Sequence, residues 1–304
     1  GCSSAPVHHE GCDIAQEAEV TSTLRWQLDI TAVSAISHRG EHSATTTTLF
    51  RREKILQPNG SAALVPIVSG NSFRGALRRI GEELLRDALA YEGLLSLSAA
   101  HTLRNGGSLT KVTGEPLSGE RLHRLRALNP QISVFGGSGG GRMIDGCLRV
   151  GKVIPHVLET DHLMTRPAPD RAVLSQFDTM ALERYSRFDD STDHDFPTVA
   201  RTDEASVEGS SLMRYEIETL PAGTRFESFL RLDRATDLDA AFFADVVDAF
   251  VESGTIGGRT AIGHGLVRTR FKRPLLAGVE RVGQHVARVE QPDVEPPNDQ
   301  RVAD

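Results

Sequence analysis

The chain has 304 residues, of which 39% are hydrophobic and 25% charged, as in an ordinary globular protein with a sizeable core. No stretch approaches the ~18 uncharged apolar residues of a membrane-spanning helix, and the N-terminus GCSSAPVHHEGC lacks the apolar centre of a secretory signal. Three cysteines, an odd number, without such a signal predict free thiols and a cytoplasmic location.

The net charge of −7 counts against a nucleic-acid ligand, because proteins that bind nucleic acid are usually basic. The distribution of charge along the chain is compatible with a nucleic-acid ligand, because the local potential and not the net charge decides where phosphate binds. Acidic residues crowd into Glu159–Glu218 and the run from Glu290 to the C-terminus. Basic residues gather in four runs: Arg51–Lys54, Arg74–Arg86, Arg121–Arg126 and Arg268–Arg273.

Residues 1–22 are expected to form a flexible leader, and the first strand follows them. Apolar residues alternate there with polar ones, which is the period of a half-buried strand: Leu24, Trp26, Leu28, Ile30 and Ala32. A loop is expected at Ser37–Ser43, then a β-prone run over Thr45–Ile55 and a short strand at Leu64–Val68. A helix is predicted from Asn71 to Ala90, with Phe73, Leu77, Ile80 and Leu84 at helical spacing.

The second half of the chain begins with a glycine-rich run between Gly136 and Gly146, in which Gly136–Gly141 is expected to be a mobile loop or one that a neighbouring subunit orders. Residues 156–211 show no sustained period and are interpreted as an arm inserted into a compact core. Met213–Leu232 is predicted to be a hairpin that turns at Pro221-Ala222-Gly223. A helix over Leu238–Ser253, a second glycine-rich loop and a strand over Leu266–Phe271 complete the core, and residues 274–304 are expected to form a flexible acidic tail. This order predicts an α+β fold with an antiparallel sheet, for which the ferredoxin-like arrangement fits.

The segment Ser69–Arg79, SGNSFRGALRR, carries the strongest functional signal. Ser69 or Asn71 can cap the helix, and Gly70 allows a ligand to approach the backbone closely. The first N–H groups of the helix, with Ser72 and Arg74, would bind an anion. A capped helix whose arginines are simply solvated is an equally good interpretation of the residues alone.

This segment resembles a motif of the RAMP superfamily of CRISPR proteins, in which a strand ends in Pro-Gly-Ser-Ser-hydrophobic-Lys/Arg-Gly. Gly70, Ser72, Phe73, Arg74 and Gly75 match it, whereas Ser69 and Asn71 differ. Three further segments resemble family motifs in the family's order: Phe135-Gly136, Glu216–Phe226 and Gly257–Val267. In its length, in FGG (Phe135–Gly137) and in GRTAIGHGLV (Gly258–Val267), the chain most resembles the type IV effector backbone subunit.

The resemblance implies an RRM-like palm made of residues 23–155 and 212–273, with residues 156–211 as an inserted thumb. It implies a subunit that binds guide RNA (crRNA), forms a helical homo-oligomer along it, and assembles with a large subunit and a guide 5′-end-capping subunit. The target nucleic acid would be bound by base pairing, and no cofactor, metal or membrane is implied. The candidate RNA-binding residues are His38, Arg39, Arg51, Arg52, Asn71, Ser72, Arg74, Arg78, Arg142, Met164, Arg201, Arg259 and His264.

Catalysis would depend on the loop SHRGEHS (Ser37–Ser43). Related type III subunits that cut RNA carry an Asp in the corresponding loop, and this loop has none. The sequence therefore predicts a binding subunit without catalytic residues. Two alternatives stay open: a RAMP endoribonuclease that uses Glu41 or His42, and a structural protein that self-assembles without RNA.

Overall fold

The computed structural model describes residues 21–44, 46–107, 119–139, 142–165, 172–187, 213–272, 279–282 and 285–288. Nearly all of the predicted leader, most of the predicted tail, and residues 166–171 and 188–211 of the predicted thumb lie outside these ranges. No helix in the described ranges is both long and apolar enough to cross a membrane.

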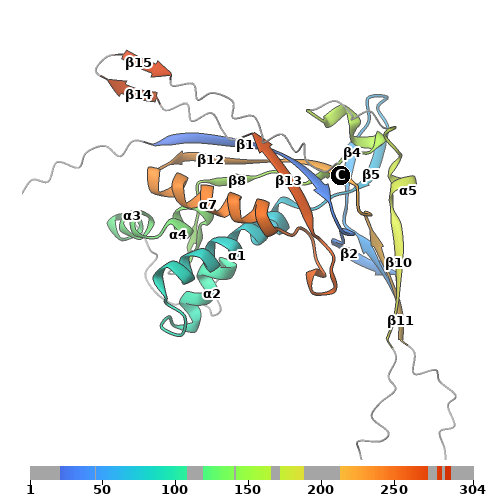
Figure 1. Cartoon of the computed structure of the whole chain (residues 1–304), viewed down its shortest axis with the longest axis horizontal. Helices are drawn as coiled ribbons and strands as arrows, with labels where there is room; N and C mark the ends of the chain where they lie inside the picture. The colour runs from blue at the N-terminus through green and yellow to red at the C-terminus, as the bar shows by residue number, and fades with distance from the viewer. Residues whose placement is uncertain are drawn as a thin grey trace, which may run out of the picture.

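A central antiparallel sheet organises the molecule (Figure 1). Its strands lie in the order β13 (Val267–Lys272), β1 (Ser22–Ala32), β12 (Arg225–Ala235) and β8 (Leu148–Val150), and β9 (Ile154–Pro155) also pairs with β12. The helices α1 (Gly70–Leu89), α4 (Pro130–Phe135) and α7 (Asp237–Ser253) lie on one side of the sheet. The path β1–α1–β8–β12–α7–β13 is that of a ferredoxin-like fold, so the predicted fold class is confirmed.

Local sequence explains these elements. The alternating side chains of β1 are buried toward the helices, as the period of two predicts. Ser69 caps α1 by accepting a hydrogen bond from the Ser72 N–H. Aromatic pairs stabilise the packing: Trp26 of β1 meets Phe243 of α7 edge-on with ring centroids 5.3 Å apart, and the rings of Phe73 on α1 and Phe250 on α7 are 5.1 Å apart.

The remaining elements are insertions into this path. A second sheet has the order β10 (Ala181–Arg187), β11 (Met213–Thr219), β3 (Thr47–Phe50) and β2 (Arg39–Ala44). Two further hairpins are β4 (Arg52–Leu56) with β5 (Ala62–Pro66), and β14 (Val279–Val282) with β15 (His285–Arg288). The others are α2 (Leu97–Asn105), α3 (Gly119–Leu128), β6 (Gly137–Gly139), β7 (Arg142–Ile144), η1 (Leu158–Leu163), α5 (Gln176–Thr179) and η2 (Thr260–Ile262).

Three local predictions are wrong. The segment Met213–Leu232 is not a hairpin, because β11 joins the second sheet and β12 the central sheet. The segment SHRGEHS contributes the strand β2 rather than a loop. The first glycine-rich run forms the β6–β7 ribbon, since Gly136 comes so close to the returning chain that a Cβ on it would lie 2.2 Å from the Ile144 carbonyl oxygen.

Two glycines of α1 differ in the space around them, which gives a matched test of packing. A Cβ at Gly81 would lie 2.6 Å from Gln131 Oε1, and Gln131 is held by hydrogen bonds to the Arg78 and Leu103 carbonyls. A Cβ at Gly75 would meet nothing closer than 3.8 Å. We expect Gly81→Ala to destabilise the fold by about 1–3 kcal/mol, and Gly75→Ala to stabilise it by up to about 1 kcal/mol.

Denaturant unfolding of the two variants beside the unaltered chain checks this expectation. Equal shifts in the same direction would show that helix propensity alone, and not the space at Gly81, sets the outcome.

Candidate functional site

The start of α1 is fixed by a histidine from the segment before β2. The Ser69 N–H donates to His38 Nε2 at 3.3 Å, and Ser69 Oγ lies 3.2 Å from the same nitrogen. Burial, and then the nearby Arg51 guanidinium, lower the pKa of His38. Since Nε2 accepts a hydrogen bond, the imidazole is neutral with its proton on Nδ1. His38 therefore positions the helix start.

A groove of about 1010 Å³ runs from the start of α1 past the end of α2 and the β6–β7 ribbon to β8. Seven cationic side chains line it, against one carboxylate, that of Asp145. The cations are Arg51, Arg74, Arg78, Arg79, Arg104, Arg149 and Lys152. In a chain of net charge −7, this concentration makes the groove a site of positive potential.

Arg78 has a structural role inside this region. Its guanidinium donates to the carbonyl oxygens of Phe135, Gly136, Thr102 and Leu103, and only 7% of the residue is exposed. Burial, and then the charge of Arg74, lower the pKa of Arg78 to about 10, so it remains a cation near neutral pH. The interpretation that the arginines of this helix are solvated is wrong for Arg78, because the helix turns this residue toward α2 and α4.

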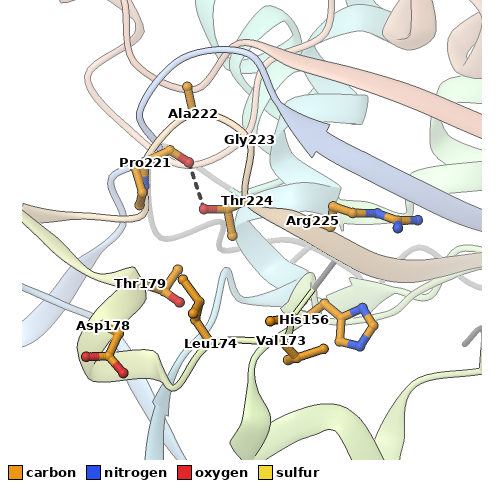
Figure 2. A pocket seen from close by; sticks show the side chains of 11 residues that line it. His156, Val173, Leu174, Asp178, Thr179, Pro221, Ala222, Gly223, Thr224 and Arg225 are labelled. Carbon is orange, nitrogen blue, oxygen red and sulfur yellow. Dashed lines mark hydrogen bonds between the residues drawn. The ribbon is translucent and has the colours of Figure 1, made fainter. Parts of the chain in front are cut away.

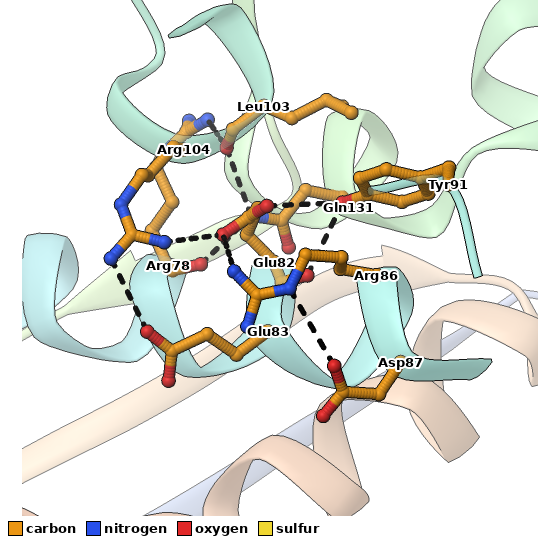
Figure 3. Close-up of polar contacts among 9 residues, drawn as sticks. All are labelled: Arg78, Glu82, Glu83, Arg86, Asp87, Tyr91, Leu103, Arg104 and Gln131. Carbon is orange, nitrogen blue, oxygen red and sulfur yellow. Dashed lines mark hydrogen bonds and ion pairs between the residues drawn. The ribbon is translucent and has the colours of Figure 1, made fainter. Parts of the chain in front are cut away.

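Neighbouring charges are largely paired. Arg74 donates to the Leu148 carbonyl at 2.6 Å and the Phe135 carbonyl at 3.0 Å. Figure 3 shows the buried Glu82 one turn beyond Arg78, where Arg104 Nη1 lies 2.7 Å from it and Tyr91 donates to it at 3.2 Å. Lys152 pairs with Glu53 and Arg149 with Asp233 on the rim.

Arg51 and Arg79 are the lining cations whose guanidinium groups have neither an ion-pair partner nor a hydrogen-bond acceptor in the described part of the chain. Arg51 Nε is buried without a hydrogen-bond acceptor, and Arg79 is exposed. Asn71, Gly75 and Arg79 follow at intervals of four residues, so they share one face of α1, and all three line the groove. That spacing was available in the sequence, which nevertheless did not single out Arg79, Arg104, Arg149 or Lys152.

A second, smaller hollow of about 260 Å³ lies between β2, β11 and the last glycine-rich loop. It brings His38, Arg39 and Arg259 together from distant parts of the chain. Arg259 has a left-handed backbone with φ of 61°, which is uncommon outside glycine, and its guanidinium lies 5.6 Å from the centroid of the Tyr215 ring. Such strain persists where the surrounding fold holds it, and functional sites are frequent places for it.

Other predicted residues are engaged within the protein. Arg52 forms a two-pronged pair with Glu218 at 2.9 and 3.0 Å. His264 is 5% exposed and lies 2.7 Å from the Tyr185 hydroxyl, which donates to Glu183 at 2.6 Å. Burial and Glu183 raise the pKa of Tyr185 to about 12, so the phenol keeps its proton.

The last predicted residues are dispersed. Ser72 lies in the first turn of α1, Arg142 is exposed on β7, and Met164 follows η1. Arg201 and the side chains of Glu41 and His42 are outside the part of the chain that the structure describes. Within that part, no three His, Cys, Asp or Glu side chains are arranged to hold a metal ion.

Two comparisons with known proteins find similarity over most of the chain. The model of the RAMP superfamily matches residues 47–268. A chain of a solved structure described as "Type IV-B CRISPR Complex" is 33% identical, with a TM-score of 0.57, and the match covers 89% of this chain and 96% of that one. A search of curated proteins finds no match.

Proposed function

This chain belongs to the RAMP superfamily, and we propose that it is a backbone subunit of a type IV CRISPR ribonucleoprotein that holds guide RNA without cutting it. The observation that carries the proposal is the groove at the start of α1, with seven cations and one carboxylate along it. Phosphate is the ligand that such a surface attracts most strongly, and RNA presents phosphates in a row.

The chemistry of the groove favours the sugar-phosphate backbone over the bases. Gly70 and Asn71 bring the start of α1 to the groove wall, where the first N–H groups of a helix lack acceptors within the helix and favour an anion. Arg51 and Arg79 add two charges that no carboxylate of the described residues neutralises. Phe135, the aromatic residue of the lining, is 2% exposed and offers no face for stacking. Binding with little sequence preference follows.

The hollow at His38, Arg39 and Arg259 supplies a second contact for the same strand. It lies beyond His38, whose ring contacts Ser69 at the groove. Arg39 is exposed, and the strained Arg259 backbone directs its guanidinium over Tyr215. We assign Arg39 and Arg259 to phosphate contacts and His38 to positioning of the helix start.

The proposed absence of cleavage follows from the segment Ser37–Ser43, which has no aspartate. We expect the protein–guide complex to leave a labelled complementary RNA intact over hours, with or without Mg²⁺. Regularly spaced cuts that disappear in Glu41→Gln or His42→Gln would identify an endoribonuclease instead.

The same preparation tests binding, since sequencing of the copurified nucleic acid should return guide RNA. Assemblies that contain no nucleic acid and survive nuclease would identify a purely structural protein.

Self-assembly along the guide requires two complementary surfaces, and opposite ends of the molecule offer them. To one, the α2–α3 surface, we assign the exposed leucines Leu94, Leu97 and Leu128 with the basic Arg121 and Arg124. The other, the α5 surface, consists of Leu158, Leu174 and Phe177 with Asp161 and Asp178. The helices α3 and α5 lie near opposite ends of the long axis in Figure 1.

The α5 surface adjoins a pocket of about 220 Å³ that can receive an apolar side chain. Figure 2 shows Leu174, Asp178 and Thr179 on one side and the turn Pro221–Thr224 on the other. Phe177 is 81% exposed, and its burial against leucines of another copy would be favourable because it removes apolar surface from water. A contact between unlike surfaces repeats from copy to copy and generates an open filament. We propose that other CRISPR subunits, a large subunit and a guide 5′-end-capping subunit, complete the assembly.

A further inference from the structure

The side of the central sheet that faces away from α1, α4 and α7 carries no α-helix in the described part of the chain (Figure 1). Side chains on this open face alternate with the buried ones along each strand. Six arginines and three carboxylates occupy it, an excess of three positive charges. They are Arg25, Arg149, Arg225, Arg231, Arg268 and Arg270 with Asp29, Glu227 and Asp233. Arg149 lies on the edge strand β8 and also lines the groove at α1.

Existing contacts account for the carboxylates, whereas Arg25, Arg268 and Arg270 form no ion pair with the described residues. Asp29 lies 3.2 Å from Arg225, and Glu227 accepts hydrogen bonds from Thr165 at 2.7 and 3.0 Å. Asp233 pairs with Arg231 at 2.7 Å and with Arg149 at 3.6 Å. Arg268 and Arg270 are exposed, and the described residues give neither an ion-pair partner.

The sheet register brings these two arginines to a built hollow. Thr31 pairs with Arg268 on one side and Arg225 on the other, and Arg270 lies across from Asp29. These five residues line a cavity of about 200 Å³. The cavity holds three guanidinium groups and one hydroxyl, and its one carboxylate is already paired. Hydrogen-bond donors therefore remain available to a ligand, and the geometry of guanidinium groups matches that of phosphate oxygens.

An aromatic side chain stands on the same face. Phe229 follows Arg225 by four residues on β12, a distance of about 13 Å along the strand. The Arg25 guanidinium lies 5.4 Å from the centroid of its ring. Gly151 makes room for the ring, since a Cβ there would lie 2.7 Å from Phe229 Cδ1. An aromatic ring beside arginines on an open sheet is the arrangement by which proteins stack single-stranded bases.

We propose that this open face is a second binding surface for single-stranded nucleic acid, separate from the groove at α1. Phosphates would bind Arg268, Arg270 and Arg225, and a base would stack on Phe229 beside Arg25. The surface lies on the opposite side of the sheet from α1, so one complex would hold the guide in its groove and a further strand on the open face. An acidic peptide would also be attracted by the arginines, but it has no use for Phe229.

The test uses the RNA-loaded protein and a fluorescent ten-nucleotide oligouridine that is not complementary to the guide. We expect Arg268→Gln with Arg270→Gln to weaken its binding at least about tenfold and to reduce the slope of log affinity against log salt by about 1.4. Phe229→Ala should weaken it without changing that slope. Arg184→Gln, an exposed arginine on β10, is the matched control and should have no effect.

Guide loading, measured on the same preparations, separates this surface from the groove. The Arg268/Arg270 variant should load guide RNA as the unaltered protein does. Unchanged oligouridine binding in that variant would overturn the proposal. So would equal binding of a fluorescent polyglutamate peptide that Phe229→Ala does not affect, since this would identify an acidic protein as the partner. Loss of guide loading in the variant would place these arginines in the guide's own path.

Discussion

Replacement of Arg51 and Arg79 by glutamate is expected to weaken RNA binding on the order of 100-fold, because each change removes a charge-assisted phosphate contact and adds a repulsive charge. Both side chains line the groove, and neither has an ion-pair partner among the described residues. The change therefore removes ligand contacts without breaking an internal ion pair. Fluorescence anisotropy with a labelled oligouridine measures the effect on RNA-free protein that also carries Arg268→Gln and Arg270→Gln, so that the groove is probed without the open face.

The glutamine version of the same pair gives a second readout. Loss of two phosphate contacts should reduce the slope of log affinity against log salt by about 1.4. Arg86→Gln is the matched control, since it lies on the same helix outside the groove, and its salt slope should not change. Unchanged affinity and slope in both Arg51/Arg79 variants would leave α1 as a capped helix without an RNA role.

Arg74 and Arg78, the residues that the sequence suggests first, are poorer choices for this test. Their guanidinium groups donate to the carbonyl oxygens of Phe135 and its neighbours. Removal of either leaves buried acceptors without donors, which costs about 1–3 kcal/mol of folding free energy. A loss of RNA binding in those variants could therefore come from a lost RNA contact or from a destabilised fold, and the measurement would not distinguish the two.

The second large effect concerns assembly. Phe177→Asp and Leu97→Asp are each expected to stop filament growth on a long RNA, because each places a charge in one of the two apolar surfaces. Both residues are strongly exposed, at 81% and 77%, so the fold should tolerate the changes. Light scattering and negative-stain microscopy report the length of the assemblies.

Mixing the two variants tests the pairing of unlike surfaces. Phe177→Asp keeps its α2–α3 surface and Leu97→Asp keeps its α5 surface, so a mixture should form one-to-one dimers and grow no further. Leu238→Asp, outside both surfaces, is the control and should still form filaments. Full-length filaments in either single variant would refute the assignment of that surface. Unchanged affinity for a short RNA would show that RNA binding itself is intact.

The sequence by itself determined the elements of the core and their order. The alternation of β1 and the helical spacing of Phe73 and Leu77 depend on local geometry, because a strand or helix buries one face whatever packs against it. The capped start of α1 at Ser69 could also be predicted from the sequence, because capping involves residues only three positions apart. These features sufficed for an α+β fold and for a candidate site at SGNSFRGALRR.

Only the tertiary structure decided what each face meets. The side chains of β11 and β12 alternate as those of a hairpin would, but the partners of these strands, β10 and β1, come from other segments. A period of two shows that a segment is a strand and does not determine which strand it pairs with. The same holds for α1, where the contacts with α2 and α4 bury Arg78 and leave Arg79 exposed one residue later. An arginine is available to RNA only if carbonyl oxygens of the protein do not already accept its hydrogen bonds, and the fold of the whole chain determines this.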